Sequence, residues 1–203
     1  MKQIRKTALA LIAAALLSSG CAPLMLGGAM VGGSLVATDR RTSGAQLEDQ
    51  AIELKAIGRL REALGERGHV NTTSYNRMVL ISGEVPAEAD RAAVEQAVSR
   101  IDNVRSVLNE LVVASSSSIS ARSNDSLISG KVKATFLDAK DVQVNTIKVV
   151  TERGVVYLMG RVSEREATRA AELTRGISGV QKVVRVFEIL TDAELAALGG
   201  SKN

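Results

Sequence analysis

The sequence predicts an α+β protein that contains two tandem copies of one small domain. Residues 49–113 and 124–190 resemble each other at an offset of 76 residues, and each segment reads as helix, strand, strand, helix, strand. The run Ser115–Ser118 separates the copies and has the composition of a flexible linker. The matched positions on the first helices are Ile52 with Ile128, Ala56 with Val132, Leu60 with Phe136, and Ala63 with Ala139.

Each copy is expected to begin with an amphipathic helix, because its apolar residues recur at helical spacing. This helix is predicted over Asp49–Gly65 in the first copy and begins at Asn124 in the second. Two strands follow in each copy, over His69–Tyr75 and Met78–Val85, and over Val142–Val150 and Val155–Val162. Both second strands end in Gly-x-Val, so we expect Gly83 and Gly160 to lie where only a residue without a Cβ fits.

A second helix and a valine-rich strand complete each copy. The helices are predicted over Ala87–Arg100 and Glu164–Gly176, the strands over Val107–Val113 and Val183–Leu190, and a last helical turn over Asp192–Leu198. We expect the acidic residues from Glu164 to Glu166 to stabilise a helix N-terminus rather than to act in acid–base chemistry. The predicted organisation is an export signal over 1–20, a tether over 21–46, the first domain over 47–114, a serine-rich linker over 115–123, the second domain over 124–191, and a tail over 192–203.

The N-terminus is predicted to direct export. Three basic residues precede the uncharged stretch Thr7–Leu17, which is shorter than the roughly 20 apolar residues that a membrane-spanning helix needs. The small residues that lead into Cys21 resemble a bacterial lipobox, although Ser18 replaces the usual leucine. That resemblance implies cleavage before Cys21, acylation of its thiol and new amine, and, because Ala22 follows, an outer-membrane anchor facing the periplasm. The alternative is an ordinary signal peptide with an incidental cysteine.

The segment Pro23–Ala37 is expected to be an apolar, glycine-rich tether close to the bilayer surface. Its small residues would also allow close packing of backbones, as small-residue motifs do in membranes. A phosphate-binding loop is not expected, because no strand precedes the glycines and no Lys-Ser/Thr pair follows them.

The charge of the chain argues against a nucleic-acid binder. The full chain has a net charge of +4 and a pI near 9.4, but cleavage before Cys21 removes three cations and leaves +1. A nucleic-acid binder needs a concentrated basic face. Within the repeats, residues 49–113 hold 8 basic and 10 acidic residues, whereas residues 124–190 hold 11 basic and 8 acidic residues. The positive charge is therefore concentrated in the second copy.

The residue inventory excludes most enzymes, and we expect no catalytic activity, cofactor or metal site. One histidine and one cysteine cannot form a zinc cage, a Cys–His nucleophile pair or a disulfide. His69 is expected to be a strand-end residue rather than a catalytic base. Asp138 and Asp141 lie near a helix end with too few oxygen donors around them for a metal site.

The strand signature points to a known family. The motif Val-x-Leu-x-Gly-x-Val over Val156–Val162, followed by an acidic, alanine-rich helix and then by Ile177-Ser178-Gly179-Val180, resembles the BON domain. Lipobox, tether and tandem repeats together resemble the division and outer-membrane stress-associated lipid-binding lipoprotein family. The resemblance implies that each domain has a three-stranded mixed sheet packed against two helices. It also implies a non-enzymatic outer-membrane lipoprotein that binds anionic phospholipids and maintains membrane integrity, with division sites as one place of action.

We expect the first helix of the second copy to contact lipid. Helical geometry places Leu127 and Leu137 opposite the core face, beside Lys131, Lys133 and Lys140. Leucines that enter the headgroup boundary beside lysines that meet lipid phosphates are typical of an interfacial helix. The predicted lipid-contact residues, for phosphatidylglycerol or cardiolipin, are Leu127, Lys131, Lys133, Phe136, Leu137 and Lys140.

Two other interpretations of this helix face remain open. Leu127 and Leu137 would pack against the linker or the first domain if the two domains associate through this helix, and single exposed leucines are common. Alternatively, the lysines are only solvated, and the chain is a periplasmic protein-interaction module whose domain surfaces dock an envelope enzyme or assembly machinery.

Overall fold

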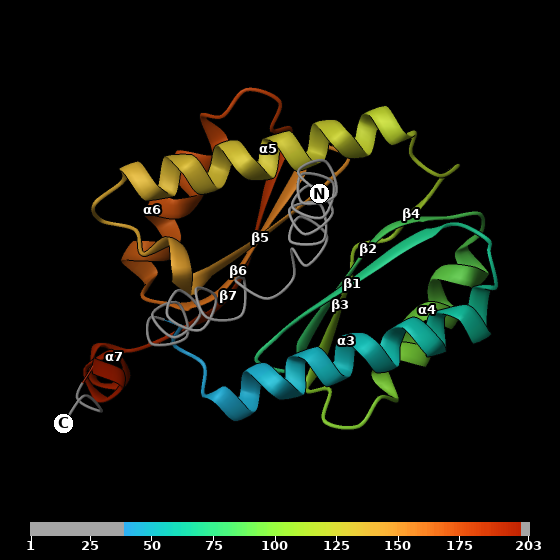
Figure 1. Cartoon of the computed structure of the whole chain (residues 1–203), viewed down its shortest axis with the longest axis horizontal. Coiled ribbons are helices and arrows are strands. Elements are labelled where there is room, and N and C mark those ends of the chain that lie inside the picture. The colour runs from blue at the N-terminus through green and yellow to red at the C-terminus, as the bar shows by residue number, and fades with distance from the viewer. Residues whose placement is uncertain (1–38, 200–203) are drawn as a thin grey trace, which may run out of the picture. The chain divides into compact units, whose positions relative to one another are not determined.

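The structure, a computed structural model, describes residues 39–199 and confirms the α+β class and the repeated order of elements (Figure 1). The predicted signal peptide, Cys21 and the tether before Asp39 lie outside the described residues, as do residues 200–203.

The first domain is a mixed sheet covered on one face by two helices (Figure 1). The antiparallel pair β1–β2 forms a hairpin, and β3 and β4 lie parallel to β2 on its other side. Its elements are α3 (Ser43–Leu64), β1 (His69–Tyr75), β2 (Met78–Val85), α4 (Glu88–Ser99), β3 (Ser106–Asn109) and β4 (Val112–Val113).

The second domain repeats this plan, with β5–β6 antiparallel and β6–β7 parallel. Its elements are α5 (Ile119–Asp138), a 3₁₀ turn η1 (Val144–Thr146), β5 (Ile147–Glu152), β6 (Val155–Val162), α6 (Glu164–Arg175) and β7 (Lys182–Ile189), and α7 (Asp192–Gly199) follows. The resemblance to BON domains therefore implied the correct sheet and helix arrangement.

Each domain has its own hydrophobic core between its helices and its sheet. Ile52 and Ala56 of α3 are completely buried against β2 and α4 in the first core. Ile128, Val132 and Phe136 of α5 occupy the same place in the second core. The predicted pairing of the repeats thus corresponds to matching core positions.

Both first helices begin earlier than predicted, because polar caps start them before their apolar pattern does. Thr42 caps α3 by accepting a hydrogen bond from the amide of Ala45 at 3.1 Å, and Ser118 caps α5 through the amide of Ala121 at 3.2 Å. The prediction of a linker over 115–123 is therefore wrong in part. Residues 119–123 are helical, and Ser117 is buried and donates to the carboxylate of Glu84.

Two predicted strands also differ from the observed ones. The strand predicted from Val142 begins at Ile147, because η1 closes the turn after α5. The strand predicted over Val107–Val113 is interrupted between β3 and β4, where the side chain of Asn109 accepts from the amide of Leu111 at 3.1 Å.

The two sheets also contact each other through the faces that their helices leave uncovered. Tyr75 and Leu80 of the first sheet form one buried cluster with Tyr157, Met159 and Val186 of the second. As a result β2 and β6 are buried on both faces along most of their length. Around this cluster, cross-domain hydrogen bonds join Asn71 to Glu152, Asn76 to Glu188, Lys148 to Glu53, and Arg153 to Glu84.

Candidate lipid-contact face

The outward face of α5 is set by its buried face. Since Ile128, Val132 and Phe136 point into the core, residues half a turn away point to solvent. Leu127 is 65% exposed and Leu137 is 70% exposed, so their predicted outward orientation is confirmed. Two large apolar side chains with this exposure on one helix face can enter a partner or a bilayer surface without any change in the fold.

The three predicted lysines are exposed on the same helix or just after it. The ammonium group of Lys131 lies 3.5 Å from the carbonyl oxygen of Ser178. Within residues 39–199, Lys131, Lys133 and Lys140 form no ion pair with a carboxylate. The carboxylate of Asp141, close to Lys140 in sequence, is paired with Arg169 at 2.9 Å instead. The face therefore presents apolar and cationic groups together.

Phe136 does not belong to this face, and its assignment as a lipid-contact residue is wrong. It has no exposed surface and packs within the core of the second domain. Helical geometry already places it with Ile128 and Val132, so its effect on lipid binding is limited to holding α5 against the sheet.

Ile119 belongs to the face and was not predicted. It is 80% exposed, more than either Leu127 or Leu137. It lies 18 residues before Leu137, five helical turns, and so on the same side of α5. The signal that would have identified it is the cap residue Ser118, which places Ile119 in the first turn of the helix.

The interpretation that Leu127 and Leu137 pack between the domains is not supported. Both side chains are mostly exposed, and the domains meet through the sheet residues around Tyr75 and Tyr157. The apolar face of α5 is therefore not used for packing within residues 39–199.

The buried carboxylates of Asp49 and Asp125 hold the fold together. Asp49 accepts hydrogen bonds from Ser74 Oγ and the amides of Asn76 and Arg77 at 2.6–2.7 Å, and pairs with Arg41 at 2.8 Å. Burial raises the pKa of Asp49, but these hydrogen bonds outweigh burial and hold it below its ordinary value. Asp125, its counterpart in the second repeat, accepts from the amides of Arg153 and Gly154 at 2.8 Å. Neither carboxylate is free to act on a substrate.

The predicted cap at the start of α6 is confirmed. Ser163 and Glu166 form a capping box, and Arg40 forms two hydrogen bonds of 2.8 Å with the carboxylate of Glu166. Burial raises the pKa of Glu166, but the bonds from Arg40 and Ser163 outweigh it and lower the pKa overall.

His69 and Tyr157 each lie beside a polar side chain. His69 begins β1, as predicted, and its Nε2 lies 3.1 Å from Asn71 Nδ2. Burial raises the pKa of Tyr157, whose hydroxyl lies 3.4 Å from Glu110. Within residues 39–199 no group of three or more His, Cys, Asp or Glu side chains is placed to hold a metal ion.

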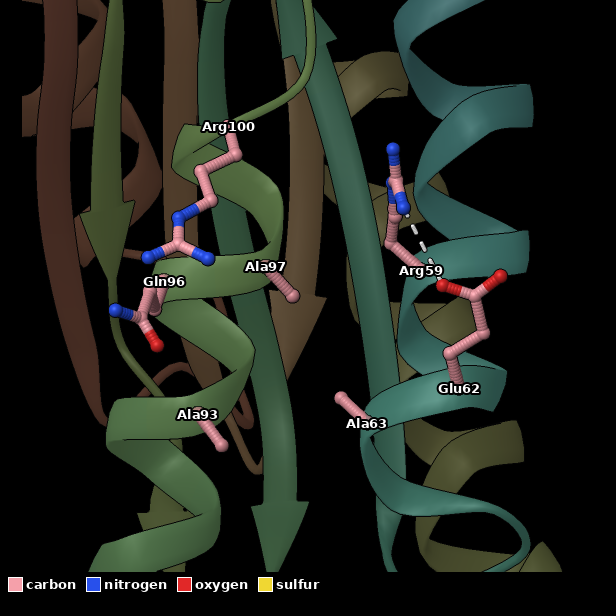
Figure 2. Close-up of a pocket in the computed structure, with 7 residues that line it drawn as sticks. All are labelled: Arg59, Glu62, Ala63, Ala93, Gln96, Ala97 and Arg100. Atoms are coloured by element: carbon pink, nitrogen blue, oxygen red, sulfur yellow. Dashed lines mark hydrogen bonds and ion pairs between the residues drawn. The ribbon is translucent and has the colours of Figure 1, made fainter.

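An open groove of about 530 Å³ lies between α3 and α4 (Figure 2). Its floor is formed by Ala63, Ala93 and Ala97, and Arg59 and Arg100 stand on opposite sides of it. Arg59 is paired with Glu62 at 3.4 Å, and no nucleophile or buried acid lines the groove. The groove therefore offers no chemistry that would compete with the face of α5.

The buried carboxylate of Glu152 has a raised pKa. Burial is the main cause, and repulsion from Glu84 and Asp125 adds to it, while a hydrogen bond of 3.1 Å from Asn71 opposes it. The folded protein therefore binds this proton more readily than the unfolded chain does, so its stability falls as the pH rises through the folded-state pKa.

Glu152→Gln is expected to raise the free energy of unfolding at pH 7.5 by about 1 kcal/mol, and so the melting temperature by roughly 2–4 °C. The reason is that glutamine has no charge to bury and still accepts a hydrogen bond from Asn71. The gain should shrink at pH 4.5, where Glu152 is increasingly protonated. Thermal unfolding at the two pH values measures this, and Glu66→Gln at an exposed position is the control. A pH-independent or negative change would contradict the prediction.

Comparison with known proteins agrees with this fold. The BON domain family matches residues 49–115 and 124–191. The outer membrane lipoprotein DolP of Haemophilus influenzae is 34% identical over 193 residues, which cover 94% of this chain and 98% of that protein. The chain belongs to the DolP family of dual-BON lipoproteins. The DolP-family chain is thus an outer-membrane protein held by a lipid anchor.

Two further relatives of this DolP-family chain match smaller parts of it. The 21 kDa hemolysin of Actinobacillus pleuropneumoniae is 30% identical over 151 residues, 73% of this chain and 78% of that protein. The osmotically-inducible protein Y of Escherichia coli is 26% identical over 159 residues, 74% of this chain and 77% of that protein. Of the helices within residues 39–199, none is both long enough and apolar enough to cross a membrane.

Proposed function

We propose that this lipoprotein binds anionic phospholipid, phosphatidylglycerol or cardiolipin, through the outward face of α5. The observation that carries the proposal is the exposure of Leu127 and Leu137 on the same helix as Lys131 and Lys133, with Lys140 just beyond its end. Ile119 extends the apolar part of the face to the start of the helix.

The charge and the apolar area of this face favour a weak but selective contact with lipid. Each lysine near an anionic surface contributes about 1 kcal/mol, and the apolar side chains add the free energy of leaving water. Phosphatidylcholine offers the same apolar boundary without the net negative charge, so the lysines supply the selectivity. Acylation of Cys21, which lies outside the described residues, would hold this face at a high effective concentration of lipid.

The role that follows is non-catalytic. A protein anchored by acyl chains that also binds anionic headgroups responds to the local lipid composition. We propose that this supports the integrity of the outer membrane, including where the envelope constricts at division.

The test is binding of the chain from residue 22, without acyl groups, to vesicles of phosphatidylglycerol or of phosphatidylcholine. We expect binding to phosphatidylglycerol, and we expect Leu127→Glu with Leu137→Glu to weaken it at least about tenfold, because two carboxylates would then face the headgroups. Leu54→Glu is the matched control, since Leu54 on α3 is 70% exposed, as Leu137 is, but has no cluster of lysines around it.

Two outcomes would contradict the proposal. Equal, negligible binding to both kinds of vesicle would exclude phospholipid as the ligand. It would favour the alternative role of a periplasmic module that docks an envelope protein. If the Leu54→Glu variant lost binding and the α5 variant kept it, the contact would lie on the first domain.

A further inference from the structure

The first domain also exposes an apolar helix face, and it differs in chemistry from the face of α5. Leu47, Leu54 and Ile57 of α3 are 66%, 70% and 56% exposed. They lie on the side of α3 opposite Ile52 and Ala56, which are completely buried. This face has no packing role within residues 39–199.

Small and large residues alternate along this face at coiled-coil spacing. Gly44, Leu47, Ala51, Leu54 and Gly58 follow one another at intervals of three, four, three and four residues, so leucines occupy one core position of a heptad and small residues the other. The stripe is about 21 Å long. Leucines and small residues in alternate layers allow two helices to approach closely, with each leucine over a small residue.

No contact within residues 39–199 requires glycine at position 58. A Cβ at this position would meet nothing within 4 Å, and its backbone is ordinary helix. Glycine inside a helix is less favourable than alanine, so alanine would be favoured at an open site. The fold of one copy therefore does not require glycine here, as it does not at Gly130 of α5, but on the stripe the missing side chain leaves room for a close neighbour.

We propose that α3 pairs in antiparallel orientation with α3 of a second copy of the chain. In that register Leu47 packs over Gly58 of the partner subunit, and Leu54 packs over Ala51 of the partner subunit. The two-fold axis passes between residues 51 and 54, so the same contacts occur twice.

Charge complementarity favours a second copy of the chain as the partner of this face. Glu48 and Lys55 border the stripe on one side, seven residues apart. Antiparallel pairing brings Glu48 opposite Lys55 of the partner subunit, and the symmetry repeats this pair. Within residues 39–199 of one copy, these groups pair with the exposed loop after α4, where Asn103 donates to Glu48 at 3.0 Å and Asp102 lies 3.6 Å from Lys55.

A lipid surface fits this face less well. The stripe of α3 is bordered by Glu48 and Glu62 as well as by Lys55 and Arg61, and residues 49–113 carry a net charge of −2, so this face has no excess of positive charge to attract an anionic surface. On α5, Lys131 and Lys133 border the apolar face on both sides, which favours an anionic surface and disfavours self-association. The equivalent helices of the two repeats therefore present surfaces that favour different partners.

The contact is small, so its strength depends on where the protein is held. A single helix pair buries less than the roughly 1,200 Å² of a standard stable interface. Attachment of both copies to one membrane raises their effective concentration and compensates for the small area.

Engineered cysteines in the full-length protein in its own membrane test the pairing, because Cys21 is the chain's only cysteine. Ala51→Cys alone is expected to form a disulfide-linked dimer on oxidation, because residue 51 lies beside the two-fold axis. Leu47→Cys with Gly58→Cys in one chain should also cross-link, whereas either substitution alone should not. Arg59→Cys, exposed but off the stripe, is the matched control, and the unsubstituted protein reports any dimer formed through Cys21.

Charge reversal then tests the register. In the Ala51→Cys background, Glu48→Lys or Lys55→Glu alone should reduce the rate of cross-linking about tenfold, and the double reversal should restore it. Cross-linking of Ala51→Cys no faster than Arg59→Cys would overturn the proposal, and cross-linking of Leu47→Cys alone would overturn the antiparallel register. Variants of Leu127 and Leu137 should leave the dimer intact, so this proposal and lipid binding by α5 fail separately.

Discussion

Gly83→Ala is expected to unfold the first domain at growth temperature. Gly83 lies in β2 opposite Val70 of β1, with a φ of +116° that side chains rarely adopt. A Cβ at this position would overlap the carbonyl oxygen of His69, which belongs to the neighbouring strand. Because the two strands would have to separate to make room, we expect a loss of at least about 4 kcal/mol, a large part of the stability of a small domain.

The equivalent position gives a graded comparison. Gly160 has an ordinary φ, and a Cβ there would lie 2.5 Å from the carbonyl oxygen of Thr146, so Gly160→Ala should also destabilise, but less. Gly130→Ala is the control, because Gly130 lies inside α5 with nothing within 4 Å of a Cβ and should gain stability. Chemical denaturation measures all three variants. A Gly83→Ala protein with a wild-type midpoint would show that β1 and β2 do not pair as described.

Asp49→Ala is expected to cost about 3 kcal/mol. The carboxylate of Asp49 accepts hydrogen bonds from two backbone amides in the turn between β1 and β2 and from Ser74, and it pairs with Arg41. Asn76 and Arg77 in this turn both have positive φ, a conformation that needs support when neither residue is glycine. Without the carboxylate, buried donors lose their partner and the turn loses its tie to α3.

Asp125→Ala should cost less, about 2 kcal/mol, because the equivalent turn contains Gly154 and donates only two amide hydrogen bonds to Asp125. Because the pKa of Asp49 is lowered in the folded state, its contribution is present above the unfolded pKa and is lost as the pH falls through the folded pKa. The difference between wild type and Asp49→Ala should therefore shrink in acid. Denaturation at pH 7 and pH 3 measures it, and Asp138→Ala at an exposed position should change stability by less than about 0.5 kcal/mol at either pH.

Much of the fold could be predicted because its signals are local. The strands β1, β2 and β6 begin and end at the predicted residues, since alternation, Gly-x-Val and two-residue turns all lie within short windows. The starts of α3 and α5 were missed because their first turns are polar and show no apolar period. Only the caps Thr42 and Ser118 mark them.

The candidate site could also be predicted only in part. Helical geometry predicts that Leu127 and Leu137 point outward, and it also predicts that Phe136 points into the core. The roles of Asp49 and Asp125 could not be predicted, because each depends on a turn about 28 residues away in the chain. The packing of sheet on sheet had a signal in the unbroken apolar runs Val79–Ile81 and Val155–Met159, which are typical of strands buried on both faces.

That sheet contact has a consequence for how the duplicated chain can diverge. Each copy covers the sheet of the other, so a change at Leu80 or Tyr157 must be accommodated by two domains at once. The outward faces of α3 and α5 carry no such obligation, because nothing within residues 39–199 packs on them. Duplication has therefore produced a pair of domains that must remain matched along their sheets, while their outer helices are free to acquire different partners.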